Sequence, residues 1–321
     1  MGVRIGIDEN GLGPRLGPLT VTAVSARTTD EGTKRVERKP RGKLAQRLGD
    51  SKDLVAFGDS ALGEAWARAI ALRLGIPASS PDELVRALSL DPIEELRAPC
   101  PDDHHAQCWS TLDERFEADD ATVGEVARDL DALARGGVEI ASARVAIVCT
   151  SRLNAAASRG LSRFDVDLHT MERLALEARE RLCPEPDASG RSEVHATCGK
   201  VGGYNQYSGA FGPLAGRLHT AIVEGRARSE YSFPGFGRIA FVRDADAKHA
   251  LVAMASLVGK WVRDLLMRRI VRYHRASIPD LPLASGYHDP VTAQFVEATA
   301  LVRKKRRLPD DCFERTRVAR D

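Results

Sequence analysis

Apolar residues alternate with polar or small residues in five short stretches of the chain, and this period of two predicts β-strands. The first stretch contains Val3, Ile5 and Ile7 and ends at two adjacent carboxylates, Asp8 and Glu9. The five strands that the alternation predicts are 3–8, 18–26, 142–149, 193–198 and 238–243.

Apolar residues recur every three or four positions in longer stretches, which predicts amphipathic helices. Ser80 followed by Pro81 has the order of a helix start, and Gly136 with Gly137 is a typical helix end. Residues 27–47 are polar and basic without apolar periodicity, so we expect a long loop there. The predicted helices are 61–74, 80–88, 121–135, 169–183, 249–274 and 291–303. Strands and helices together predict an α/β fold.

The two carboxylates at the end of the first strand stand directly before a turn built on Gly11, Gly13 and Pro14. Mg²⁺ takes oxygen ligands, commonly one or two carboxylates together with phosphate oxygens. Glycine in such a turn lets the backbone approach a ligand closely. Asp8 and Glu9 are therefore candidate metal ligands, although acidic residues in turns are also common for local reasons.

Composition narrows the class of protein. The chain has 321 residues, 43% of them hydrophobic and 29% charged, which is ordinary for a globular protein. No apolar run approaches the roughly 18 residues of a membrane span, and the first residues lack the layout of a signal peptide. Six scattered cysteines do not form a disulfide framework. We expect a cytoplasmic monomer with no membrane contact.

The formal charge of +2 indicates little about partners, but basic residues cluster. Such clusters fit contact with a phosphate backbone, and equally an ordinary solvated surface, so charge alone does not decide. One cluster lies early, at Lys34, Arg35, Arg38, Lys39, Arg41 and Lys43, and another late, between Arg303 and Arg307.

Residues 5–14 resemble the opening motif of the type 2 ribonucleases H, the ribonuclease HII and HIII family, in which an Asp-Glu pair precedes a Gly-x-Gly turn and a Gly-Pro. Three later segments resemble further family motifs in the same order, and the match is patchy in 76–140. These segments are Asp50-Ser51-Lys52, Asp246-Ala247-Lys248 with Ser256 and Lys260, and Gly286-Tyr287.

This resemblance implies a ribonuclease H-like mixed β-sheet flanked by helices. Residues 1–75 and 141–275 would form a discontinuous core, and residues 76–140 a helical insertion. Residues 276–321 would supply C-terminal helices and a basic tail that completes the substrate groove.

The resemblance also implies endonucleolytic hydrolysis of RNA in an RNA/DNA hybrid, or at ribonucleotides in duplex DNA. Asp8, Glu9 and Asp246 would hold Mg²⁺ or Mn²⁺, and the glycine turn would contact the 2′-hydroxyl. Leu12 replaces the basic residue that the family usually carries between the glycines. The implied substrate-binding residues are Gly11, Leu12, Gly13, Ser51, Lys52, Asn154, Ser256, Lys260 and Tyr287.

The fourth strand lacks the acid with which the family ends it. Gly199, or Cys198 one residue earlier, takes that position, and neither offers a hard oxygen ligand. Three other acids are candidates to fold into the site: Glu193, Asp165 and Asp167. Without such a replacement the chain would be a catalytically weakened paralogue that binds nucleic acid without cutting it.

Two short motifs remain open. Cys100, His104, His105 and Cys108 can supply zinc ligands, although ligands this close together rarely close a tetrahedron and an incidental loop is the simpler interpretation. The run from Gly199 to Gly203 can cradle a phosphate through its backbone and Lys200, but it lacks the full pattern of a phosphate-binding loop.

Overall fold

A mixed sheet of seven strands forms the centre of the molecule in the residues described by the structure, a computed structural model that covers 2–100, 107–183, 193–202 and 204–316. The strand order is β3-β2-β1-β4-β7-β6-β5. β1 pairs with β2 antiparallel and with β4 parallel, and β4 pairs with β7 parallel. The strands are β1 Gly2–Asn10, β2 Leu19–Thr28, β3 Val138–Val148, β4 Val194–Gly199, β5 Thr220–Glu224, β6 Arg228–Phe233 and β7 Gly237–Val242.

The five expected strands are all present, and the expected α/β fold class with a helix-flanked mixed sheet is confirmed. The hairpin of β5 and β6 was not expected. β5 is exposed along its whole length, so it lacks a buried face that would impose alternation. In β6, Tyr231 and Phe233 do alternate with polar residues, and that pattern is the signal that could have revealed the strand.

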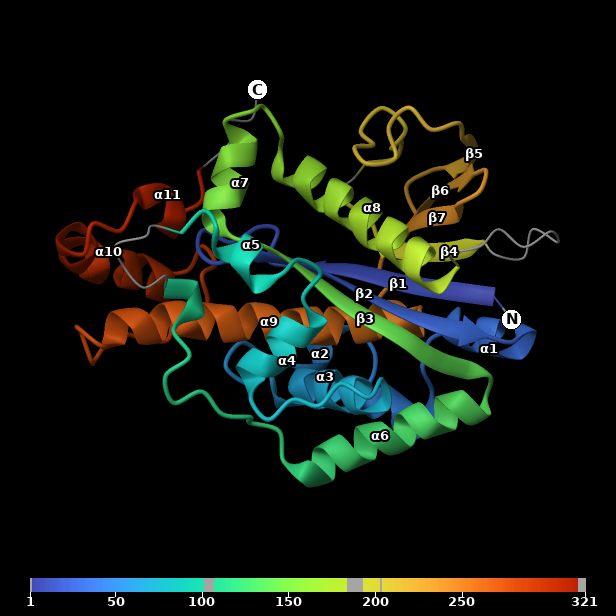
Figure 1. Cartoon of the computed structure of the whole chain (residues 1–321), viewed down its shortest axis with the longest axis horizontal. Coiled ribbons are helices and arrows are strands. Elements are labelled where there is room, and N and C mark those ends of the chain that lie inside the picture. Colours follow the sequence, from blue (N-terminus) through green and yellow to red (C-terminus); the bar gives the residue numbers. More distant parts are fainter. Residues whose placement is uncertain (1, 101–106, 184–192, 203, 317–321) are drawn as a thin grey trace.

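Helices cover both faces of the sheet, with α9 Ala250–Arg275 along one face and α8 Arg163–Leu182 along the other (Figure 1). Gly6 allows α9 to lie close to β1, since a Cβ atom there would be 2.2 Å from the carbonyl carbon of Leu251. The remaining helices are α1 Asp30–Val36, α2 Ser51–Leu54, α3 Ala61–Arg73, α4 Pro81–Leu88, α5 Ile93–Arg97, α6 Asp120–Arg135, α7 Thr150–Ala157, α10 Pro290–Lys305 and α11 Asp310–Phe313.

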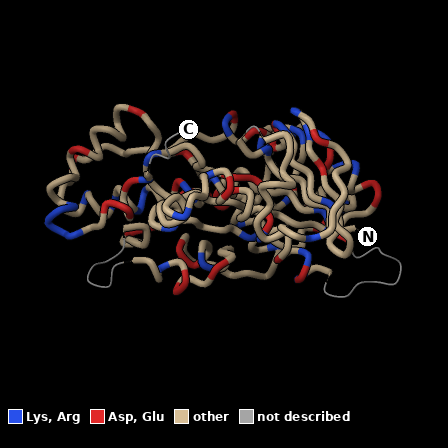
Figure 2. Tube along the Cα trace, turned by 90° about the horizontal axis from the view of Figure 1, so that it is seen from above, with Lys and Arg blue, Asp and Glu red and all other residues tan. Residues whose placement is uncertain are grey.

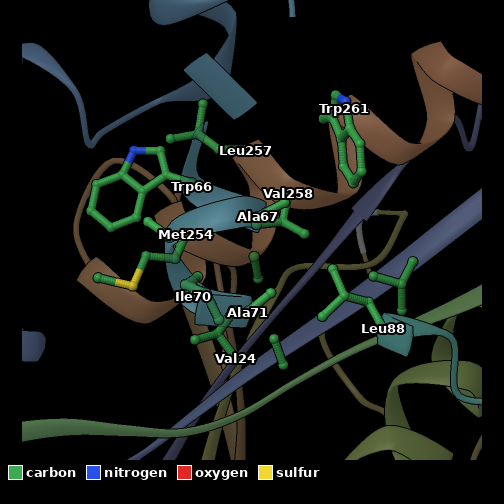
Figure 3. Packing of buried hydrophobic residues seen from close by; sticks show 14 of the residues in the cluster. Val24, Trp66, Ala67, Ile70, Ala71, Leu88, Met254, Leu257, Val258 and Trp261 are labelled. Atoms are coloured by element: carbon green, nitrogen blue, oxygen red, sulfur yellow. The ribbon is translucent and has the colours of Figure 1, made fainter. Parts of the chain in front are cut away.

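Two large apolar clusters hold these layers together. On one face, α3 packs against α9 and β2, and Figure 3 shows Trp66 and Ile70 of α3 beside Met254 of α9. α4 and α6 contribute to this same cluster, so segment 76–140 shares a core with the strands and α9. On the other face, Leu168 and Met171 of α8 pack against β1 and β4.

The expectation of one long loop over residues 27–47 was wrong. α1 begins after Thr29, whose hydroxyl accepts a hydrogen bond from the backbone N–H of Gly32, and a 3₁₀ helix spans Gly42–Gln46. α8 also begins earlier than expected, because Ser162 and Asp165 form a reciprocal capping box. α1 and the 3₁₀ helix are too short to show apolar periodicity, and in α8 the capping box adds a first turn ahead of the periodic stretch.

Charged residues are spread over the molecule, with Lys and Arg interspersed among Asp and Glu (Figure 2). The early basic cluster surrounds a cavity of about 350 Å³ lined by Arg35, Arg38, Lys39 and Arg41, among others. A bilayer-spanning helix is absent from the described residues, because none is both long and apolar enough.

Candidate active site

A cleft of about 540 Å³ opens at the ends of the central parallel strands. It is lined by segments that are distant along the chain: the end of β1 with the glycine turn, α2, the end of β4, the β7–α9 connection, α9 and Tyr287. The cleft therefore collects all four sequence motifs. Of the residues singled out from the sequence, it is lined by Asp8, Glu9, Gly11, Leu12, Gly13, Ser51, Lys52, Gly199, Asp246, Ser256, Lys260 and Tyr287.

The strand register identifies Gly199 as the position of the absent acid. Ile7 of β1 lies beside Cys198 of β4, so Asp8 and Gly199 follow side by side. A Cβ atom on Gly199 would lie 2.8 Å from Oδ1 of Asp8 and 3.2 Å from Oε2 of Glu9. Cys198 instead points into the apolar cluster beneath α8 and is fully buried. A side chain at position 199 would thus meet both carboxylates.

The electrostatic surroundings of the acid pair disfavour its negative charge. Burial raises the pKa of Asp8 well above its ordinary value, the charge of Glu9 raises it further, and a hydrogen bond with Ser256 lowers it. Burial likewise raises the pKa of Glu9, and the largest contribution from a neighbouring charge comes from Asp167. The charge of Lys52 lowers both pKa values, but more weakly. A bound cation would relieve this repulsion.

Asp246, rather than Asp244, belongs to the acid group. Burial and then the charge of Asp50 raise the pKa of Asp246, whose charge in turn acts on the Asp8–Glu9 pair. Asp244 is exposed and lies 3.5 Å from Nζ of Lys248. The family resemblance had implied Asp246 as a metal ligand as well.

α2 and α9 form one wall of the cleft through direct contacts. The hydroxyl groups of Ser256 and Ser51 are 2.9 Å apart, and Nζ of Lys260 donates to the carbonyl oxygens of Ser51 and Val55. Lys260 therefore anchors α2 to α9. Lys52 is exposed at the same wall, where its ammonium group faces the cleft rather than the core.

The glycine turn is held from behind by an arginine that sequence reasoning missed. Arg315 is buried, and its guanidinium donates to the carbonyl oxygens of Gly11, Leu12 and Gly17. Gly11 has a φ of +86°, which favours glycine. No motif marks Arg315, and only its position in the fold indicates its role.

Tyr287 lies at the rim of the cleft, 46% exposed. Its ring covers the guanidinium of Arg263 at 4.7 Å, and Arg263 in turn donates to the carbonyl oxygen of Ser285. This cation–π contact fixes the ring while leaving one side open to the cleft.

Asn154 does not line the cleft, so the expectation that it contacts substrate is not supported. It lies on α7, and its side-chain amide donates to the carbonyl oxygens of Asp311 and Glu314. Lys200 lines the cleft, but its ammonium donates to the carbonyl oxygen of Gly225 and the hydroxyl of Ser229, which weakens the phosphate-cradle interpretation.

The three acids considered as substitutes for the acid missing at Gly199 lie in different places in the fold. Glu193 precedes β4, at the end of the strand away from the cleft, and Asp165 caps α8. Asp167 is fully buried on α8, and neither of its carboxylate oxygens has a hydrogen-bond partner among the described residues.

The donor set fits a hard divalent cation in chemistry but is short of one ligand. Asp8, Glu9 and Asp246 offer carboxylate oxygens, the ligands that Mg²⁺ and Mn²⁺ prefer, whereas Gly199 offers none. No three acidic, histidine or cysteine side chains in the described part of the chain are already arranged around a common metal position. Cys100 and Cys108 are free thiols there, while His104 and His105 lie outside the described residues.

Fold and cleft together define a mixed α/β protein with an acid group at adjoining strand ends. Solved structures similar to the chain include ribonuclease HII from Archaeoglobus fulgidus in a complex with PCNA, with 18% identity, a TM-score of 0.43 and coverage of 99% of this chain and 96% of that one. Ribonuclease H2 from Pyrococcus horikoshii OT3 has 14% identity, a TM-score of 0.41 and coverage of 97% and 92%.

A Bst-RNase HIII in complex with Mn²⁺ has 13% identity and a TM-score of 0.43, with coverage of 98% of this chain and 66% of that chain. No family model and no curated protein matches the chain. At these identities and scores, the case for function depends on the residues of this chain.

Proposed function

We propose that this protein is a ribonuclease H-type endonuclease that hydrolyses RNA in RNA/DNA hybrids, or at ribonucleotides in duplex DNA, with Mg²⁺ or Mn²⁺. One observation carries the proposal. Four motifs that are scattered between residues 8 and 287 line a single cleft, in which the two partly buried carboxylates of Asp8 and Glu9 share the lining with the exposed Lys52.

The chain's own residues have separate tasks in this proposal. Asp8, Glu9 and Asp246 would hold the ion, which activates a water molecule and stabilises the attacking and leaving oxygens. The backbone of the glycine turn, held by Arg315, would receive the ribose. Lys52 would contact a phosphate, and Tyr287 would stack on the neighbouring sugar.

A second candidate is a paralogue that binds the hybrid without cutting it. Gly199 favours this alternative, because β4 ends without a carboxylate where a side chain would meet both Asp8 and Glu9. The backbone of Gly199 is not among the positive-φ positions, so an aspartate can be introduced there. The carboxylate ends of Asp8 and Glu9, which would lie 2.8 and 3.2 Å from the new Cβ atom, would have to shift.

The two candidates are separated by cleavage of an end-labelled hybrid with Mg²⁺ or Mn²⁺ by wild type, Asp8→Asn and Gly199→Asp. Cutting by wild type that Asp8→Asn abolishes supports the nuclease. Binding by wild type, with cutting only after Gly199→Asp, supports the paralogue. If none of the three proteins binds or cuts the hybrid, both candidates are refuted.

A further inference from the structure

Asp167 is an exception among the buried acids of the described chain. Four acidic residues are buried: Glu64, Asp167, Glu172 and Asp264. Glu64 accepts hydrogen bonds from two backbone N–H groups, Glu172 accepts from those of Gly212 and Leu214, and Asp264 pairs with Arg263. Asp167 has none of these contacts, and both of its oxygens are orphaned.

A fully buried carboxylate without a partner is costly, so native structures seldom contain one without a reason. The carboxylate of Asp167 thus requires a role other than packing.

The surroundings of Asp167 indicate that role. α8 packs against β1, β2 and β4, and Leu168, the residue after Asp167, shares an apolar cluster with Ile7 and Cys198, which directly precede Asp8 and Gly199. Its charge is the largest neighbouring contribution to the raised pKa of Glu9 and of the Cys198 thiol, and the charge of Asp8 acts on Asp167 in return. Asp167 therefore borders the acid pair from the α8 side of the sheet.

This is also where the site lacks a ligand. β1 supplies two carboxylates and the segment after β7 supplies one, while β4 between them ends in Gly199. Cys198 and Gly199 leave the strand end without an oxygen donor, and α8, which carries Asp167, packs against this strand with Leu168 in the same cluster as Cys198. The end of β4 thus lacks a hard ligand, and the helix that packs against this strand carries a buried carboxylate without a hydrogen-bond partner, that of Asp167.

Resting on the proposed function, we propose that Asp167 supplies the third carboxylate of the metal site, in place of the acid missing from β4. The ion would be held by Asp8, Glu9, Asp246 and Asp167, so that a residue of α8 completes a site otherwise built from strand ends. The orphaned oxygens of Asp167 then have a partner, and the loss at Gly199 is compensated rather than disabling.

The test is Mn²⁺ binding by the full chain, measured by isothermal titration calorimetry and by the electron paramagnetic resonance signal of free Mn²⁺. We expect Asp167→Asn to weaken binding by about tenfold or more. The double variant Asp167→Asn/Gly199→Asp should recover affinity, because an acid on β4 takes over. Glu172→Gln is the matched control: it neutralises a buried acid of the same helix that already has hydrogen-bond partners, and it should leave affinity unchanged.

Melting temperatures of the metal-free proteins establish that each variant is folded, and Asp167→Ser replaces Asp167→Asn if the amide does not fold. Equal Mn²⁺ affinity of wild type and the folded Asp167 variant would overturn this inference and leave the proposed function standing. Absence of Mn²⁺ binding by wild type would overturn both. If Glu172→Gln weakens Mn²⁺ binding as much as Asp167→Asn does, the inference is also overturned, because the loss of any buried charge on α8 would then weaken binding.

Discussion

At the scale of single residues, the acid pair of β1 combines burial with like charge. Asp8 and Glu9 repel each other and are repelled by Asp167 and Asp246, while Lys52 compensates only in part. Folding brings these groups together without a counter-charge of equal size. Ionisation of this acid pair therefore lowers the stability of the folded protein.

We expect Asp8→Asn to raise the melting temperature of the metal-free protein by an amount that grows with pH. The pKa of Asp8 is raised in the folded state above the ordinary value of 3.8. Below that value both folded and unfolded chains are protonated, so the substitution changes little. As the pH rises, the unfolded chain loses its proton first, and the cost of burying wild-type Asp8 increases by at most about 1.4 kcal/mol per pH unit.

The measurement is thermal unfolding in EDTA between pH 4 and pH 8, with Asp244→Asn as control, since Asp244 is an exposed acid of the same cleft. A difference between Asp8→Asn and wild type that stays constant with pH would contradict the expected repulsion. Added Mn²⁺ should stabilise wild type more than Asp8→Asn, because only wild type keeps both carboxylates of β1.

At the scale of elements, the contact between β1 and α9 sets the width of the cleft. Gly6 lies against the backbone of α9, and the hydroxyl of Ser256 on the same helix hydrogen-bonds to Asp8. Close backbone packing thus positions β1, which carries the acid pair, against α9, which carries the hydrogen-bond donor Ser256.

We expect Gly6→Ala to destabilise the protein by about 1–3 kcal/mol, since the added methyl group overlaps the backbone at Leu251 and forces α9 away from β1. The measurement is urea unfolding. Gly209→Ala is the control, because a Cβ atom at Gly209 has open space around it. Equal stability of the two variants would show that α9 has more freedom than this packing implies.

At the scale of the whole molecule, the cleft depends on contacts between the two ends of the sequence. Arg315 donates to the backbone of the glycine turn about 300 residues earlier, and Arg15 pairs with Glu314 at 2.6 Å. The turn that follows the first strand is therefore fixed by a segment that comes after the last helix, α11.

We expect Arg315→Ala to lower the free energy of unfolding by about 1–3 kcal/mol, because it leaves buried carbonyl oxygens without a donor. Hydrogen exchange should also accelerate in residues 11–17 while β2 stays protected. Lys305→Ala, an exposed cation at the end of α10, is the control. Unchanged exchange in the turn would show that Arg315 does not hold it.

The sequence predicted those parts of the molecule that local pattern determines. Alternation located β1, β2, β3, β4 and β7, and residues of all four motifs line one cleft. The exposed strand β5 has no such pattern, and Asn154 could not be distinguished from a cleft residue until α11 was seen to engage it.

The role proposed for Asp167 could not be predicted from the sequence, for a different reason. Three acids near β4 were equal candidates, and only the tertiary fold separates the helix cap Asp165 and the distant Glu193 from the orphaned Asp167. Charge environment and burial come from elements that pack together, not from neighbours along the chain.

The hold of Arg315 on the glycine turn also has a consequence during translation. Residues 11–17 leave the ribosome early, whereas their anchor is synthesised only after β7, α9 and α10. A nascent chain can assemble the central strands long before its substrate pocket takes shape. If the proposed activity is correct, ribosome-bound intermediates would be unable to attack nucleic acid near the site of their own synthesis.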